Sequence, residues 1–116
     1  MNSNKKNIVI TSAVRTAIGV FNGSLKDMQA KDLGALVTKA AMQKSNLNSK
    51  DVDELIMGQV LTSGTGQNPA RQAAIQAGIP IEKTAYVINQ VCGSGLRSVA
   101  AGYQAIMSND SKIIIA

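Results

Sequence analysis

The chain has 116 residues, a net charge of +5 and a single cysteine, and these values limit the classes of protein to which it can belong. Hydrophobic residues make up 45% and charged residues 16%, which is typical of one globular domain rather than a disordered chain. The basic residues form no stripe with interleaved aromatics, so a nucleic-acid-binding protein is disfavoured. No apolar run is long enough to span a membrane, and one cysteine cannot form an internal disulfide, so we expect a cytoplasmic protein.

The first part of the chain is predicted to contain a strand, a loop and a helix. Residues 1–6 are polar and expected to be loose, and the apolar run Ile8–Ile10 predicts a strand buried on both faces. Turn residues predict a loop over 21–24. A helix follows, whose apolar residues recur at helical spacing: Leu33, Leu36, Val37, Ala40 and Ala41.

The middle of the chain is predicted to contain a capped turn, a second strand and a second helix. Asn48 and Asp51 have the spacing that caps a short helical turn, and a strand is predicted over 54–60. Asn68 and Pro69 mark the start of a helix, because Asn caps free amides and Pro at the first helical position loses no hydrogen bond.

The last part predicts a strand over 85–89, a helix over 94–107 and a strand over 112–116. Gly102 inside the helix costs about 1 kcal/mol against alanine, which indicates close packing against a neighbour. The predicted order is β-α-β-α-β-α-β, and it favours one α/β layered domain with a mainly parallel sheet and no internal boundary.

The only cysteine, Cys92, falls at the corner between the strand 85–89 and the helix 94–107. The first amides of a helix lack internal partners and carry partial positive charge, so a thiol there should lose its proton more easily and become a nucleophile. Gly93 and Gly95 would let a substrate approach the backbone. A lone cysteine is more often an inert core residue. The corner position and the neighbouring glycines favour a chemical role, so the residues alone support a catalytic role and a packing role about equally.

Several common motifs are absent. The run Gly93–Gly95 does not continue to a third glycine at the dinucleotide spacing, and the chain has no phosphate-binding Gly-Lys-Ser/Thr. With no histidine and one cysteine, it lacks the usual ligands of a metal site and cannot form a Cys–His dyad of its own.

The segment Asn89–Arg97 reads NQVCGSGLR, and it resembles the active-site segment of the thiolase family, most closely that of the biosynthetic acetyl-CoA acetyltransferases. Three further stretches match in order, over residues 14–23, 58–61 and 66–74. The resemblance therefore covers nearly the whole chain. It implies the layered thiolase fold, with residues 1–116 forming a truncated part of the N-terminal domain.

The resemblance implies that Cys92 takes the acetyl group of acetyl-CoA as a thioester, while its backbone N–H contributes to an oxyanion site. A second acetyl-CoA would supply the carbon nucleophile and give acetoacetyl-CoA and free CoA, with thiolysis as the reverse reaction. The CoA thioester would be a substrate, and neither a cofactor nor a metal is implied. The complete enzyme is expected to be a homo-oligomer, dimer or tetramer, of fatty acid and ketone body metabolism, with no nucleic-acid or membrane partner.

The family's activating histidine, its second cysteine and the asparagine of its other oxyanion site have no counterpart in this sequence. We therefore expect the 116 residues to be inactive or to perform only the acylation step. One alternative is a fragment that acts only as an interaction or structural module. Others are a related ketoacyl synthase, which the segment 67–71 argues against, and an α/β hydrolase, which the lack of histidine argues against. Arg71 is expected to have a structural or interface role rather than a catalytic one.

Overall fold

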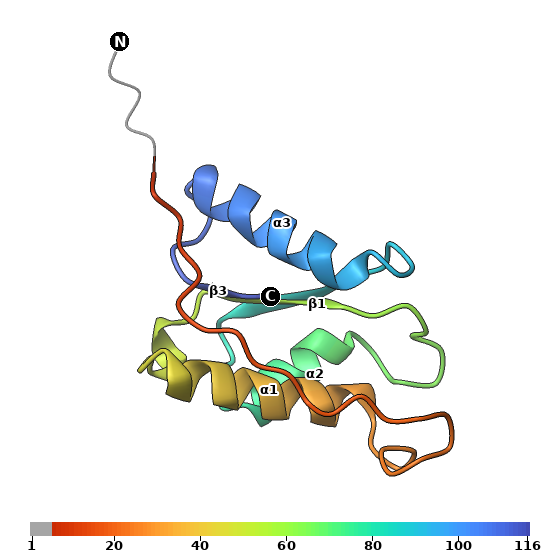
Figure 1. Ribbon diagram of the computed structural model, residues 1–116. Helices are drawn as coiled ribbons and strands as arrows, with labels where there is room; N and C mark the ends of the chain where they lie inside the picture. The colour runs from red at the N-terminus through yellow and green to blue at the C-terminus, as the bar shows by residue number, and fades with distance from the viewer. Residues whose placement is uncertain (1–5) are drawn as a thin grey trace.

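The computed structural model describes residues 6–116 and has three layers (Figure 1). The sheet consists of β1 (Glu54–Gly58), β2 (Thr84–Ile88) and β3 (Ile114–Ile115). Helices α1 (Ala30–Lys44) and α2 (Pro69–Gln76) lie together on one face of the sheet, and α3 (Ser94–Met107) covers the other. A short 3-10 turn, Ser49–Asp51, connects α1 to β1. The α/β class and the parallel sheet predicted from the sequence are confirmed.

The strands are all parallel and follow the order β2-β1-β3, so β1 is central. Asp53 lies at the amino end of β1 and links it to the segments that precede β2 and β3. Its carboxylate accepts hydrogen bonds from the amides of Lys112 (2.8 Å) and Ile113 (3.1 Å) and from Lys83 Nζ (3.2 Å). The Lys112 amide is the main cause that lowers the pKa of Asp53, helped by the Ile113 amide and Lys83 and opposed by partial burial.

Small side chains build much of the core between α2 and its neighbours. Four alanines of this region are buried: Ala70, Ala73, Ala74 and Ala77. In α1 the buried residues are Gly34, Ala35, Thr38 and Met42. The face predicted from Leu33, Leu36, Val37, Ala40 and Ala41 is therefore displaced, and Leu36 is 55% exposed. The reason is the close packing at Gly34, where a Cβ would lie 2.6 Å from Met57 Cε of β1 and 3.2 Å from Ala73 Cβ of α2.

The helix ends agree with the predicted caps. Asn68 Oδ1 accepts the Arg71 amide (3.1 Å), and Asn68 Nδ2 donates to the Ala85 carbonyl (2.9 Å), which ties the start of α2 to β2. Asn48 and Asp51 form the reciprocal capping pair of the 3-10 turn. These local patterns were sufficient to place the starts of both segments.

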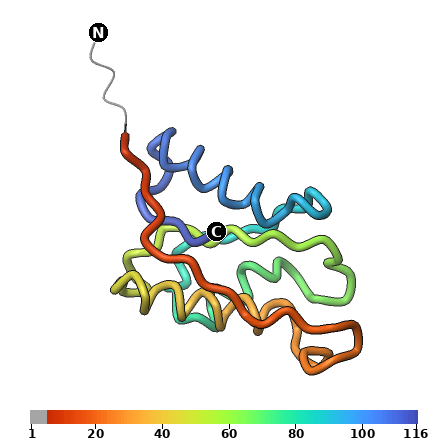
Figure 2. The backbone as a smooth tube through the Cα atoms, viewed as in Figure 1, coloured from red at the N-terminus to blue at the C-terminus, as the bar shows by residue number. Residues whose placement is uncertain are grey.

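The strand predicted at Ile8–Ile10 is wrong. The segment pairs with no strand in the described residues, and Val9 and Ile10 are 72% and 79% exposed. Residues 11–13, which follow this segment, run along α1 instead (Figure 2), where Ser12 Oγ donates to the Ala41 carbonyl (3.0 Å). The segment lines a groove of about 1060 Å³ together with α1, α3 and β3, and it forms no ladder with the sheet. The expectation for residues 1–5 lies outside the described residues.

Arg71 has the structural role that was expected, and it acts within the chain. Its guanidinium donates to the carbonyls of Lys83 (2.6 Å) and Ile81 (2.7 Å), and so fixes the segment between α2 and β2.

Replacing Arg71 with methionine is expected to lower the free energy of unfolding by about 1–2 kcal/mol, because two carbonyls lose a charged donor. Urea unfolding followed by circular dichroism measures the change. Arg97→Met is the matched control, since Arg97 is exposed and its guanidinium donates no hydrogen bond within residues 6–116. Equal losses in the two variants would contradict this role for Arg71.

Candidate functional site

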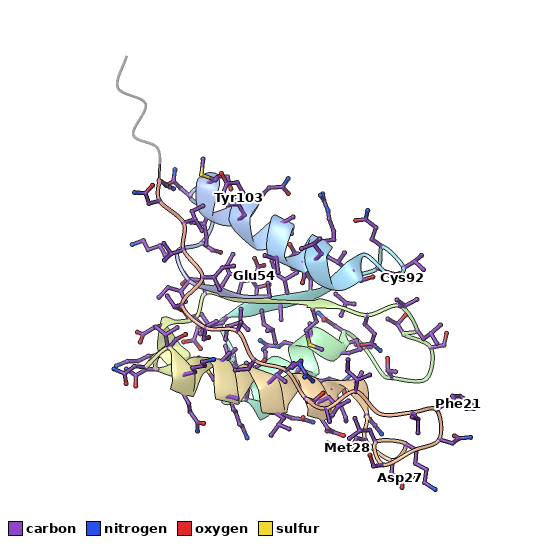
Figure 3. The ribbon with its side chains drawn as sticks, in the orientation of Figure 1. Phe21, Asp27, Met28, Glu54, Cys92 and Tyr103 are labelled. Atoms are coloured by element: carbon purple, nitrogen blue, oxygen red, sulfur yellow. The ribbon has the colours of Figure 1, made fainter. Side chains whose placement is uncertain are left out.

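Cys92 lies where the sequence placed it, in the five-residue connection between the end of β2 and the start of α3. The residue is exposed at the carboxyl edge of the sheet (Figure 3). Gly93 is the N-cap residue of α3, so the thiol precedes the first turn of that helix directly. Chemistry at this sulfur is therefore sterically possible, and Cys92 does not lie in the core of the described residues.

Two polar side chains hold the connection in shape. Ser94 Oγ accepts the Gln90 amide (2.8 Å) and donates to the Val91 carbonyl (2.6 Å). Asn89 Oδ1 accepts the Val91 amide (3.0 Å), while Asn89 Nδ2 donates to the Val60 carbonyl (3.1 Å) beyond the end of β1. None of these bonds uses the N–H of Cys92.

The glycines around the corner have different roles. A Cβ on Gly58, the last residue of β1, would lie 2.5 Å from the Ser94 carbonyl carbon and 2.6 Å from the Gly95 nitrogen. Only a glycine therefore lets the start of α3 rest on β1. A Cβ on Gly95 would meet no described atom within 4 Å beyond its chain neighbours and the backbone of its own helix, so this side of the helix start is open to a ligand.

The electrostatics of the corner come from the backbone. The amides of Gly95 and Leu96 belong to the first turn of α3 and make no hydrogen bond within residues 6–116. Such amides stabilise negative charge. Glu54 is a carboxyl group with a raised pKa, caused by burial and then by the charge of Asp110, but it lies at the other end of β1 from this corner.

Neither of two cavities in the described residues is lined by Cys92. The larger is the groove beside the N-terminal segment. The smaller, about 430 Å³, opens near the carboxyl ends of β1 and β2 and is lined by Thr62, Gly66, Asn68, Pro69, Val87 and Asn89. It reaches the corner only through Asn89, which also holds the Val91 amide. The chain alone therefore presents Cys92 on an open surface.

The sequence analysis placed Cys92 at this corner, but it assigned no role to Asn89 and gave Ser94 no specific contacts. The only signal for Ser94 is its place between two glycines, and the contact of Asn89 with Val60 requires the folded sheet. Within residues 6–116 no three side chains of the metal-binding types come together, and no helix is long and apolar enough to cross a membrane.

The comparison with known families agrees with this geometry. The thiolase N-terminal domain matches residues 8–116, and the chain therefore belongs to the thiolase family.

Curated members of the family resemble the chain closely in sequence. The chain is 55% identical over 109 residues to an acetyl-CoA acetyltransferase of Rhizobium meliloti, and 54% identical over 111 residues to one of Escherichia coli. These matches cover 94% and 96% of the chain but 28% of each relative. The chain thus spans less than a third of the length of these enzymes.

A solved structure agrees with the fold. The Acat5 thiolase of Ascaris suum, crystallised in complex with coenzyme A, superposes with a TM-score of 0.84 and 44% identity. The match covers 85% of this chain and 26% of that one.

Proposed function

We propose that residues 1–116 are part of the N-terminal domain of an acetyl-CoA acetyltransferase, and that Cys92 is its nucleophile. The observation that carries this proposal is the exposed thiol directly before the unpaired amides of α3. The curated relatives, which have that name, support the choice of acetyl-CoA as substrate.

The first step transfers an acetyl group between two sulfur atoms. The thiolate of Cys92 attacks the carbonyl carbon of acetyl-CoA, the bond from that carbon to the CoA sulfur breaks, and CoA leaves as a thiolate that takes up a proton. The N–H of Cys92 faces the negative charge that develops on the carbonyl oxygen, and the first turn of α3 favours that charge. No cofactor takes part, because CoA is carried by the substrate.

The second step joins a carbon nucleophile from a second acetyl-CoA to the acetyl group, which gives acetoacetyl-CoA and restores the Cys92 thiol; thiolysis is the reverse. Forming that nucleophile needs a base, and the chain contains no histidine. We therefore expect these 116 residues to acylate but not to complete the cycle. The complete enzyme would be a cytoplasmic homo-oligomer without nucleic-acid or membrane partners.

A second candidate is a non-catalytic interaction module, and the exposed apolar face of α3 favours it. The side chains of Leu96, Val99, Tyr103 and Met107 are all exposed on this helix. Size-exclusion chromatography with light scattering tests the idea, since a monomer at every concentration would count against it.

The decisive test of the enzyme proposal is the intact mass of the chain after incubation with acetyl-CoA. We expect one acetyl adduct on the natural sequence and none on Cys92→Ala. Circular dichroism of both proteins is the control for folding. A folded natural chain without an adduct would contradict acylation of Cys92 by these residues alone.

A further inference from the structure

Val91, the residue before Cys92, has an unusual backbone conformation. Its φ angle is +48°, in the left-handed region that β-branched residues rarely enter. Its side chain is 63% exposed, so burial of that side chain does not compensate for the conformation. Other contacts must therefore hold Val91 in this state.

Those contacts come from Asn89 on the strand side and Ser94 on the helix side. Asn89 Oδ1 accepts the Val91 N–H (3.0 Å), and Ser94 Oγ donates to the Val91 carbonyl (2.6 Å). The Ser94 amide donates to the same carbonyl (3.1 Å). Both polar groups of the Val91 backbone are thus fixed, and its two flanking peptide planes cannot rotate freely.

The two holding side chains are themselves anchored to the sheet. Asn89 Nδ2 is bound to the Val60 carbonyl (3.1 Å), which follows β1. Ser94 is only 3% exposed, and its backbone rests against Gly58. The side chains that hold Val91 are therefore anchored to the central strand, while Cys92 stays exposed.

We propose that Asn89 and Ser94 are positioning residues that hold Val91 left-handed and so direct the Cys92 thiol toward the first turn of α3. This inference deepens the proposed function, on which it rests. When the hydrogen bonds from Asn89 and Ser94 to the Val91 backbone are lost, Val91 relaxes to an ordinary extended or helical conformation. The peptide plane before Cys92 then rotates, and the thiol leaves its exposed position beside the free amides of the first turn of α3.

The test measures the second-order rate constant for alkylation of Cys92 by iodoacetamide in the 116-residue chain at neutral pH. Ser94→Ala removes both side-chain hydrogen bonds, and we expect the rate constant to fall about fivefold or more. Val91→Gly alone should retain the rate constant within about twofold, because glycine adopts the left-handed conformation without strain. In the Val91→Gly background Ser94→Ala should then have an effect of less than about twofold.

Ser98→Ala is the matched control. Ser98 is buried in the same helix, and its hydroxyl donates only to the Gly95 carbonyl (2.6 Å), away from Val91. A purely structural role for Ser94 predicts that both alanine variants slow alkylation equally, and that Val91→Gly does not rescue Ser94→Ala. Either result would overturn the proposal.

Asn89→Ala provides an independent arm if Ser94→Ala does not fold, because the Asn89 side chain is exposed. Asn89→Ala should slow alkylation, and Val91→Gly should restore the rate constant as it does for Ser94→Ala. A folded Asn89→Ala variant with the natural rate constant would overturn the proposal. Iodoacetamide needs no CoA. If Val91→Gly restores alkylation but acetyl-CoA leaves no adduct, the positioning role of Asn89 and Ser94 is supported and acylation of Cys92 is contradicted. If an acetyl adduct forms but Val91→Gly does not restore alkylation, acylation is supported and the positioning role is contradicted.

Discussion

Replacing Gly58 with alanine is expected to lower the free energy of unfolding by about 2–3 kcal/mol. The new Cβ would lie 2.5–2.7 Å from three atoms, the carbonyl carbon and oxygen of Ser94 and the nitrogen of Gly95. All three belong to the backbone, so no side chain can rotate to make room. The start of α3 must move away from β1, and urea unfolding followed by circular dichroism measures the loss.

Gly95→Ala separates this steric effect from the general cost of replacing glycine. Beyond its chain neighbours and the backbone of its own helix, no described atom lies within 4 Å of the Cβ position at Gly95, which is in the first turn of α3. Because alanine favours the helix, this variant should be neutral or up to about 1 kcal/mol more stable. A similar loss of stability in both variants would show that the contact between β1 and α3 is not the cause.

Replacing Asp53 with alanine is expected to cost about 2–3 kcal/mol of unfolding free energy, because two amides lose a charged acceptor. The Lys112 and Ile113 amides both bind this carboxylate, and through them β3 is held beside β1. The ion pair with Lys83 adds little, since both side chains are partly exposed. Thermal and urea unfolding at neutral pH measure the change.

The same carboxylate gives a pH dependence of known sign. The pKa of Asp53 is lowered in the folded chain, so its contribution is complete above the unfolded pKa of about 3.9 and is lost as the pH falls through the folded pKa. The natural chain should therefore lose more stability on acidification than Asp53→Ala does. Asp27→Ala is the control, because Asp27 is exposed and accepts no hydrogen bond within residues 6–116. A natural chain and Asp53→Ala with parallel acid profiles would contradict this assignment.

The elements governed by local patterns were predictable from the sequence. The helix predicted over 94–107 has those bounds in the structure, because its start and its apolar spacing lie within the segment itself. The strand expected at Ile8–Ile10 failed because strand pairing needs a neighbour, and an apolar run does not encode one. The buried face of α1 was misplaced for a related reason, since close approach to α2 favours Gly34 over the larger Leu36.

The candidate site divides in the same way. The position of Cys92 at a strand-to-helix corner follows from the residues on either side of it. The left-handed conformation of Val91 does not, because it depends on Asn89 reaching Val60 and on Ser94 lying against Gly58. Those contacts join residues about 30 positions apart, and they exist only once the sheet has formed.

The central place of β1 has a consequence for the rate at which the chain folds. Glu54 pairs with Thr84 in β2 and with Ile114 in β3, so the two ladders close loops of very different length. The shorter loop costs less chain entropy, and β1 and β2 should associate first. During synthesis the same order is imposed by the ribosome, because β1, α2 and β2 emerge before β3 exists. Until then the amide and carbonyl groups on one side of β1 have only water as a partner, which makes this interval the one in which a chaperone would be of most use.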